Sequence, residues 1–250
     1  MLKKLLKYDL KWVGKVLIVF YTLGFIFALF ALLFNSISEA EFVKIIGAIC
    51  GGVSMSMVIS ALFNSILRSW TRYIQNMYKD ESYLTHTLPI EKSEIFLSKF
   101  LTAIITSLVS LLIIVICVFI SYYSNAMVDF FKMAIKEYYP LIIIAILEVV
   151  FILLIGYLGI TLGYKKNQNK LLWAIIYSFI IYIALSGVSL LLVYVYGLVF
   201  HSGDNIFSQS EIALSEMKDY LYFILGVYVL YNIGIYFANI KVLNTGVDVD

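Results

Sequence analysis

Six long apolar runs constrain this chain more than any other feature of its sequence. They lie at about residues 16–34, 45–67, 100–124, 140–164, 171–198 and 220–240. A helix that crosses the hydrocarbon core of a bilayer needs about 20 apolar residues, because each residue adds only about 1.5 Å. Inside the bilayer a helix also satisfies its own backbone hydrogen bonds. The sequence therefore predicts an all-α integral membrane protein with six transmembrane helices.

The composition agrees with this class. Hydrophobic residues make up 62% of the chain and charged residues 14%, whereas soluble domains carry about 25% charged residues. No polar stretch between the runs is long enough for a soluble domain, so we predict one membrane domain over residues 1–250. In the fourth run, Gly159 and Gly163 have the G-x-x-x-G spacing that lets helices approach closely. The partner helix could belong to this chain or to a second copy.

Basic residues lie mostly on one predicted side of the membrane. Four of the 18 lysines and arginines, namely Lys44, Lys132, Lys136 and Lys218, fall on one side, and the other fourteen fall on the side that holds both termini. Because cytoplasmic loops carry an excess of lysine and arginine, we predict a multi-pass plasma-membrane protein with both termini in the cytoplasm. The net charge of +2 reflects this topology and does not indicate binding to nucleic acid.

The residues before the first run have an amphipathic pattern. Leu2, Leu6 and Leu10 recur at helical spacing, and lysines line another ridge. Residues 1–13 are therefore predicted to form an interfacial helix in the headgroup layer. The alternative is a longer first span with a basic flank, which the acidic Asp9 favours because it interrupts the apolar face.

Residues that could carry enzyme chemistry are few. The two histidines, His86 and His201, are predicted on opposite sides of the membrane, and no metal or P-loop motif is found. Cys50 and Cys117 fall inside apolar runs, where they are expected to act as small fillers. We therefore predict no enzyme activity, no catalytic or metal-binding residue and no bound cofactor for this chain.

One long polar segment, Asp80 to Lys99, interrupts the apolar runs on the basic side. Leu84 and Leu88 lie one helical turn apart, as do Tyr83 and Thr87, which predicts a short helix with a half-apolar face beside Asp80 and Glu81. Pro89 ends this helix, because the residue before a proline is pushed out of the helical region. Such a helix is suited to dock on a soluble partner.

This segment resembles the ABC-2 type permease family, the membrane subunits of ATP-binding-cassette exporters. The resemblance rests on YLTHTLPIEKSEIFLSK, residues 83–99, in which five positions match the family pattern: Leu88, Pro89, Ile90, Lys92 and Lys99. The resemblance extends to the whole chain only in its architecture, that is, in the number of spans, the basic N-terminal helix and the chain length. The resemblance implies that the region from Asp80 to Leu88 is a coupling helix that contacts an ATPase, and that residues 1–13 are a connecting helix.

The resemblance also implies the partners. Two copies of a separate ATPase subunit would bind ATP and Mg, and a second permease subunit, identical or homologous, would complete the pathway through the lipid membrane. The expected function is a permease subunit of an exporter, with ATPase coupling through Asp80, Glu81, Tyr83, Leu84, Thr87 and Leu88. Sixteen lysines against two arginines suggest an AT-rich bacterial genome, in keeping with a bacterial plasma membrane.

Glu148 is the one charged residue within the fourth run. A carboxylate near mid-membrane costs roughly 3 kcal/mol on insertion scales, so it is expected to face a neighbouring helix or a wet cavity. It is therefore either a structural hydrogen-bonding group or part of a substrate path. The alternatives to a permease subunit are an ATPase-independent secondary transporter or channel, and a membrane enzyme or sensor.

Overall fold

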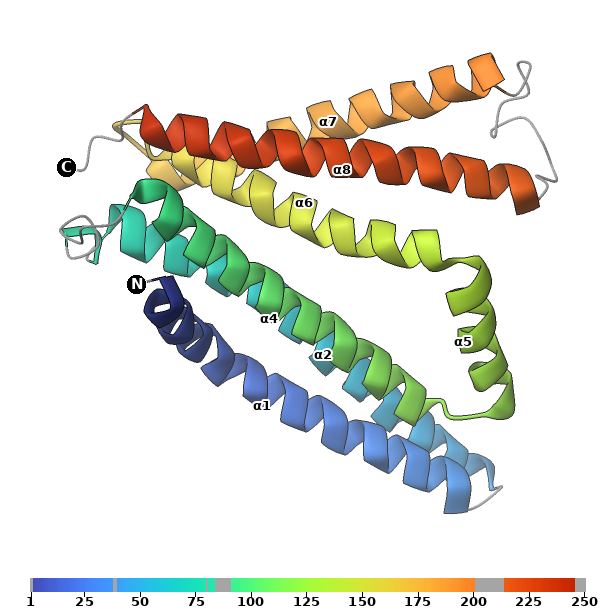
Figure 1. Cartoon of the computed structure of the whole chain (residues 1–250). Coiled ribbons are helices and arrows are strands. Elements are labelled where there is room, and N and C mark those ends of the chain that lie inside the picture. The colour runs from blue at the N-terminus through green and yellow to red at the C-terminus, as the bar shows by residue number, and fades with distance from the viewer. Residues whose placement is uncertain (1, 38–39, 80, 84–90, 201–213, 246–250) are drawn as a thin grey trace. The chain divides into compact units, whose positions relative to one another are not determined.

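The computed structural model describes residues 2–37, 40–79, 81–83, 91–200 and 214–245, and nearly all of these residues are helical (Figure 1). No strand occurs in these ranges. The helices are α1 (Leu2–Ile37), α2 (Glu41–Tyr78), α4 (Lys92–Ser121), α5 (Asn125–Glu137), α6 (Tyr139–Gly163), α7 (Lys170–Phe200) and α8 (Leu214–Asn244).

Six of these helices, all except α5, are long and apolar enough to cross a membrane. The predicted all-α class and the six candidate spans are thereby confirmed. Several helices extend well beyond their apolar runs. The 38 residues of α2 measure about 57 Å at 1.5 Å per residue, against about 30 Å for a hydrocarbon core. The polar end of α2 therefore continues out of the apolar layer as helix.

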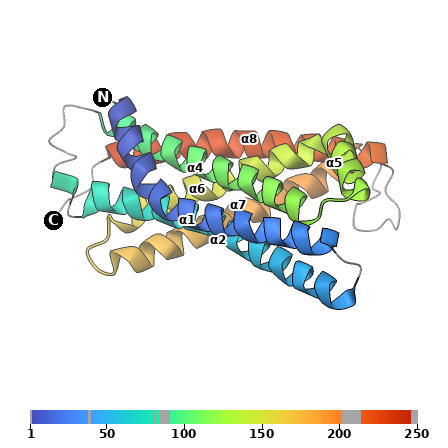
Figure 2. The same cartoon turned by 90° about the horizontal axis from the view of Figure 1, so that it is seen from below.

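The contacts divide the chain into two compact units, residues 1–137 and 138–250. Each is described by itself, and the single membrane domain expected over residues 1–250 stays a prediction. In the first unit α1, α2 and α4 pack side by side (Figures 1 and 2). Small and polar side chains allow this close packing: the Ser54 hydroxyl of α2 donates to the Gly24 carbonyl oxygen of α1 at 2.7 Å. Ala28, Val58 and Cys117 form a buried apolar cluster from the three helices.

The short helix α5 was not predicted, because its 13 residues lie in what the sequence suggests is a short outer loop. Phe131 of α5 meets Phe119 of α4 edge to face, with ring centroids 5.6 Å apart. Asp129 and Lys132 form an exposed ion pair on α5. This aromatic contact joins α5, an amphipathic helix, to the end of α4.

In the second unit α6 packs against both α7 and α8. Gly159 and Gly163 lie against Ala174 of α7, so closely that a methyl group at either glycine would overlap it. From α8, Asn232 and Asn239 donate to the carbonyl oxygens of Leu147 and Leu154 at 3.2 and 3.1 Å. The close contact predicted from the G-x-x-x-G spacing is therefore made, and its partner is α7 of the same chain.

Candidate functional site

The polar segment singled out in the sequence starts where α2 ends. Glu81 lies in a turn three residues beyond the last residue of α2, and α4 begins at Lys92 after an extended Glu91. Four of the six predicted coupling residues, namely Asp80, Leu84, Thr87 and Leu88, lie outside the described residues. Tyr83 is described and is 76% exposed, so its side chain is open to contact from outside the first unit.

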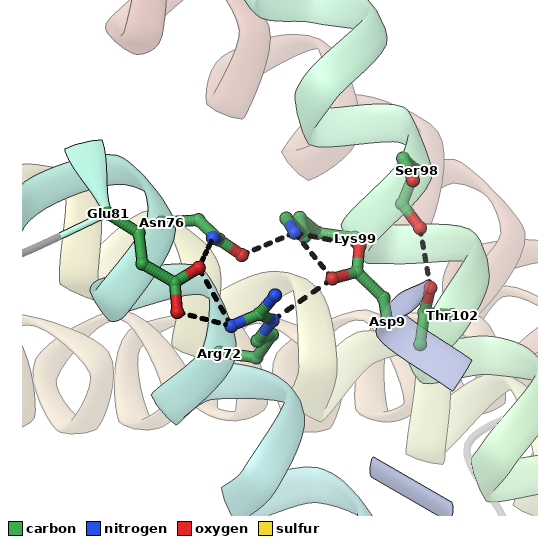
Figure 3. A network of polar contacts seen from close by, with 7 residues as sticks. All are labelled: Asp9, Arg72, Asn76, Glu81, Ser98, Lys99 and Thr102. Atoms are coloured by element: carbon green, nitrogen blue, oxygen red, sulfur yellow. Dashed lines mark hydrogen bonds and ion pairs between the residues drawn. The ribbon is translucent and has the colours of Figure 1, made fainter. Parts of the chain in front are cut away.

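A buried ion pair lies at the base of this segment (Figure 3). Lys99 of α4 approaches both carboxylate oxygens of Asp9 of α1 at 2.7 Å. Their side chains are 5% and 2% exposed. Arg72 of α2 adds a second cation, with Nε 3.1 Å from Asp9 Oδ1. One carboxylate therefore joins α1, α2 and α4.

Glu81 extends this network toward the polar segment. Arg72 Nη1 donates to both Glu81 carboxylate oxygens, at 2.8 and 2.9 Å. Asn76 donates through Nδ2 to Glu81 and accepts from Lys99 Nζ through Oδ1. Figure 3 shows that these contacts run without a break from Glu81 to Asp9. We call Asp9, Arg72, Asn76, Glu81 and Lys99 the charged network.

Aromatic side chains surround the charged network. Trp12, one turn after Asp9 on α1, faces the guanidinium groups of Arg68 and Arg72, whose central carbons lie 4.7 and 5.4 Å from its ring centroid. Tyr73 of α2 meets Phe96 of α4 edge to face at 6.2 Å between centroids. Within the network, the side chains of Asp9 and Lys99 are buried whereas that of Glu81 is 44% exposed. A lower local dielectric constant therefore strengthens mainly the Asp9–Lys99 contact.

The charges of the network balance, with two carboxylates against two cations. Burying an ion is costly, and partner contacts offset that cost only when each charge stays paired. Removing one partner from a buried pair typically destabilises a protein by about 3–5 kcal/mol. The network is therefore a device that holds three helices and the start of the polar segment in one arrangement.

Sequence reasoning found one member of the network, Glu81, and missed the pairing of the others. Asp9 was noticed only as an interruption of an apolar face, and Lys99 only as the last residue of the family-like motif. An acid in the first helix and a lysine at the start of a later span are a signal for a long-range pair. The sequence does not reveal their partners, because Asp9 and Lys99 are separated by 90 positions.

Glu148, the other predicted site residue, lies on α6 in the second unit. The Tyr182 hydroxyl of α7 donates to its Oε1 at 3.4 Å. The carboxylate thus faces helices α7 and α8 of its own unit. The choice between a structural and a substrate-path role stays open at this point.

Neither site has the ligand set of a metal centre: no group of three or more histidine, cysteine or acidic side chains comes together in the described ranges. The charged network holds helices together, and Glu148 offers an acceptor within an apolar bundle.

No protein family model, no curated protein and no solved structure matches this chain.

Proposed function

We propose that this chain is the membrane subunit of an exporter that is powered by a separate ATP-binding-cassette ATPase. The proposal starts from the resemblance of residues 83–99 to the ABC-2 type permeases. The structural observation that supports it is the link from Glu81 through Arg72 to Asp9 and Lys99. The polar segment is thus fastened at its base to all three long helices of the first unit.

This fastening suits a segment that transmits force. A partner that displaces residues 81–91 pulls on Glu81, and the short charge contacts pass the displacement to α1, α2 and α4 together. A segment joined only by flexible loops would dissipate the same movement. In the proposed mechanism Asp80, Leu84, Thr87 and Leu88 provide the docking surface, with Tyr83 exposed beside them.

The first residues of α1 are proposed to act as the connecting helix at the cytoplasmic membrane surface. Residues 2–13 are continuous with the first span, and Figure 2 supports the proposal because the dark blue start of α1 turns away from the rest of the helix. Lys3, Lys7 and Lys11 are exposed, whereas Asp9 is buried in the charged network. Asp9 therefore points into the bundle and leaves the basic ridge free for anionic headgroups.

The remaining parts of the proposal follow from this assignment. Two copies of the ATPase bind ATP and Mg, and a second permease subunit completes the pathway. Both termini and the polar segment lie in the cytoplasm of a bacterial cell, as the distribution of basic residues favours.

The test replaces the apolar docking residues by a charge. Leu84→Asp and Leu88→Asp are each expected to abolish copurification of the ATPase with this chain, because a buried apolar contact becomes an unpaired charge that costs several kcal/mol. The control is Met133→Asp, a matched change at an exposed position of α5, which should leave copurification intact. Membrane insertion is checked by the yield of each variant from detergent extracts.

Two outcomes would contradict the proposal. The first is that a P-loop ATPase fails to copurify with the wild-type chain from its native membranes. The second is that both leucine variants retain the ATPase and support transport at the wild-type rate. Transport by the purified chain without any ATPase would favour the alternative, an ATPase-independent transporter or channel. The feature that favours this alternative is Glu148, because intramembrane carboxylates mark ion pathways in such proteins.

A further inference from the structure

Glu148 is surrounded by aromatic side chains from two neighbouring helices. The hydroxyls of Tyr182 of α7 and Tyr228 of α8 both hydrogen-bond to the carboxylate. Phe151 follows Glu148 by three positions on α6, so both side chains lie on one face of the helix. The Phe151 ring contacts Tyr182, Tyr228 and Tyr231, with centroid distances of 6.1, 5.6 and 6.0 Å. One carboxylate and four rings thus occupy the same level of the bundle.

Buried oxygens at this level lack hydrogen-bond donors. Glu148 Oε2, the Tyr231 hydroxyl and Asn232 Oδ1 are buried without a hydrogen-bond partner among the described residues. Asn232 donates through Nδ2 to the Leu147 carbonyl oxygen at 3.2 Å, which places its amide next to the level of Glu148. An ionised carboxylate oxygen and an amide oxygen can only accept hydrogen bonds, whereas the Tyr231 hydroxyl can also donate one. Two acceptor oxygens at this level, Glu148 Oε2 and Asn232 Oδ1, therefore have no donor among the described residues, and no cationic side chain pairs with them.

We propose that Glu148, Tyr182, Tyr228, Tyr231 and Asn232 form a binding site for an organic ammonium ion that carries an apolar group. Its N–H groups supply the missing donors to the carboxylate and the amide oxygen. The rings attract its charge, since a cation within about 6 Å of an aromatic face is stabilised electrostatically. The tyrosine rings, which are partly exposed at the surface of the unit, receive the apolar group, and the buried Phe151 ring supports them from behind. A metal ion is a poorer fit, because only one carboxylate is present.

The site has a route of access along α7. Only Ala174 and Gly197 are buried in this helix, and the Tyr182 side chain is 38% exposed at the surface of its unit. Glu148 lies eight residues from Pro140, about 12 Å along α6 at the helical rise. Because a charged group is costly to bury in hydrocarbon, an amphipathic amine would enter the apolar layer in its neutral form and take up a proton at the carboxylate.

The inference deepens the proposed function by naming an amphipathic amine as the cargo class, but binding itself needs no ATPase. The chain is therefore tested alone, in phosphatidylcholine nanodiscs at pH 7 without nucleotide. The probe is radiolabelled 1-adamantylammonium, measured by equilibrium dialysis against empty nanodiscs. The neutral 1-adamantanol has nearly the same shape and is the reference ligand. Failure of the ATPase copurification would thus leave this measurement interpretable.

The ammonium is expected to bind saturably and at least tenfold more tightly than the alcohol. Glu148→Gln should lower the ammonium affinity at least tenfold and leave the affinity for the alcohol unchanged. Asp219→Asn, a matched loss of an exposed acid on α8 of the same unit, should bind like the wild type. Tyr182→Leu, which removes a ring without changing charge, should weaken ammonium binding at least threefold.

Three results would overturn the inference: equal affinity of the wild type for ammonium and alcohol, an unchanged affinity in folded Glu148→Gln, or an equal loss in Asp219→Asn. The charge preference of the wild type decides the matter if Glu148→Gln fails to fold. A protonated, purely structural Glu148 predicts the first result.

Nanodiscs containing phosphatidylethanolamine identify the source of the ligand. Displacement of the probe by this lipid assigns the site to a lipid amine, and undiminished binding of the probe assigns the site to a free amine.

Discussion

At the scale of single residues, Asp9 is the most consequential side chain of the first unit. Its carboxylate contacts Lys99 and Arg72, which belong to two different helices. Each cation would be costly to bury without it. The position of Asp9 also explains its presence in an otherwise basic and apolar segment: the acid is needed inside the bundle, while the lysines around it face outward.

Removing this carboxylate should destabilise the first unit. We expect Asp9→Asn to lower the free energy of unfolding by about 3–5 kcal/mol, because Lys99 and Arg72 then face one carboxylate, Glu81. The double variant Asp9→Asn with Lys99→Met restores the charge balance and should recover most of the loss. Both are compared with the wild type by denaturant unfolding in detergent micelles.

Asp129→Asn is the control, since it removes an acid from the exposed pair with Lys132, whose side chains are 76% and 73% exposed. Exposed pairs contribute about 0–1 kcal/mol. Equal stabilities of Asp9→Asn and Asp129→Asn would show that the charged network does not hold the helices together.

The residue scale is also where sequence reasoning was weakest. Glu81 was identified because it belongs to the predicted coupling segment, and Glu148 because it is the one charged residue within an apolar run. Their partners were not identified from the sequence. Arg72, for example, pairs with Glu81 nine positions away and with Asp9 63 positions away. Local spacing on a helix predicts contacts over three or four positions. Contacts between helices depend on rotation and depth, which hydropathy does not specify.

At the scale of elements, small residues decide which helices approach closely. Helix association within a bilayer gains little from apolar burial, because lipid is equally apolar. Gly159 and Gly163 therefore matter for their size, since they bring α6 against Ala174 of α7. The sequence predicted this contact from glycine spacing but left its partner helix open. It missed α5 altogether, because a 13-residue helix between two spans produces only a weak hydropathy signal.

Enlarging one of these glycines should separate α6 from α7. Gly163→Ala places a methyl group on the backbone of Ala174, and overpacking of this kind costs about 1–3 kcal/mol. The matched change Gly187→Ala lies on α7 with open space around it, so it should be neutral or stabilise by up to about 1 kcal/mol. Thermal unfolding of the two variants in the same detergent distinguishes them. An unchanged or higher stability of Gly163→Ala would mean that helix propensity, and not the contact with Ala174, controls the outcome.

At the scale of the whole molecule, the chain divides into two units, and the described residues of each include three membrane-length helices. Average hydropathy predicted the class and the number of long helices, because both depend on totals over about 20 residues. It did not predict the division at residue 137. That boundary depends on which helices pack against one another, as α6 packs against α7 and α8.

The predicted orientation is tested across the whole chain. The native Cys50 and Cys117 are first changed to alanine. Single cysteines are then introduced at Gln168, in the exposed turn between α6 and α7, or at Met133, on α5. In intact cells a membrane-impermeant thiol reagent should label the cysteine at position 133 and spare the one at 168, because basic residues concentrate on the cytoplasmic side. Broken cells, in which both should react, are the control. Labelling of position 168 from outside would reverse the topology.

The pairing of Asp9 with distant cations has a consequence for biosynthesis. Arg72 follows Asp9 by 63 residues and Lys99 by 90. At a translation rate of about 5–20 residues per second, Lys99 is synthesised roughly 5–20 s after Asp9. During that interval the nascent first helix carries an unneutralised acid at the membrane surface. The ribosome therefore synthesises α1 before Arg72 and Lys99, the cations that pair with Asp9. The final packing of α1 can form only after α4, which carries Lys99, has been synthesised.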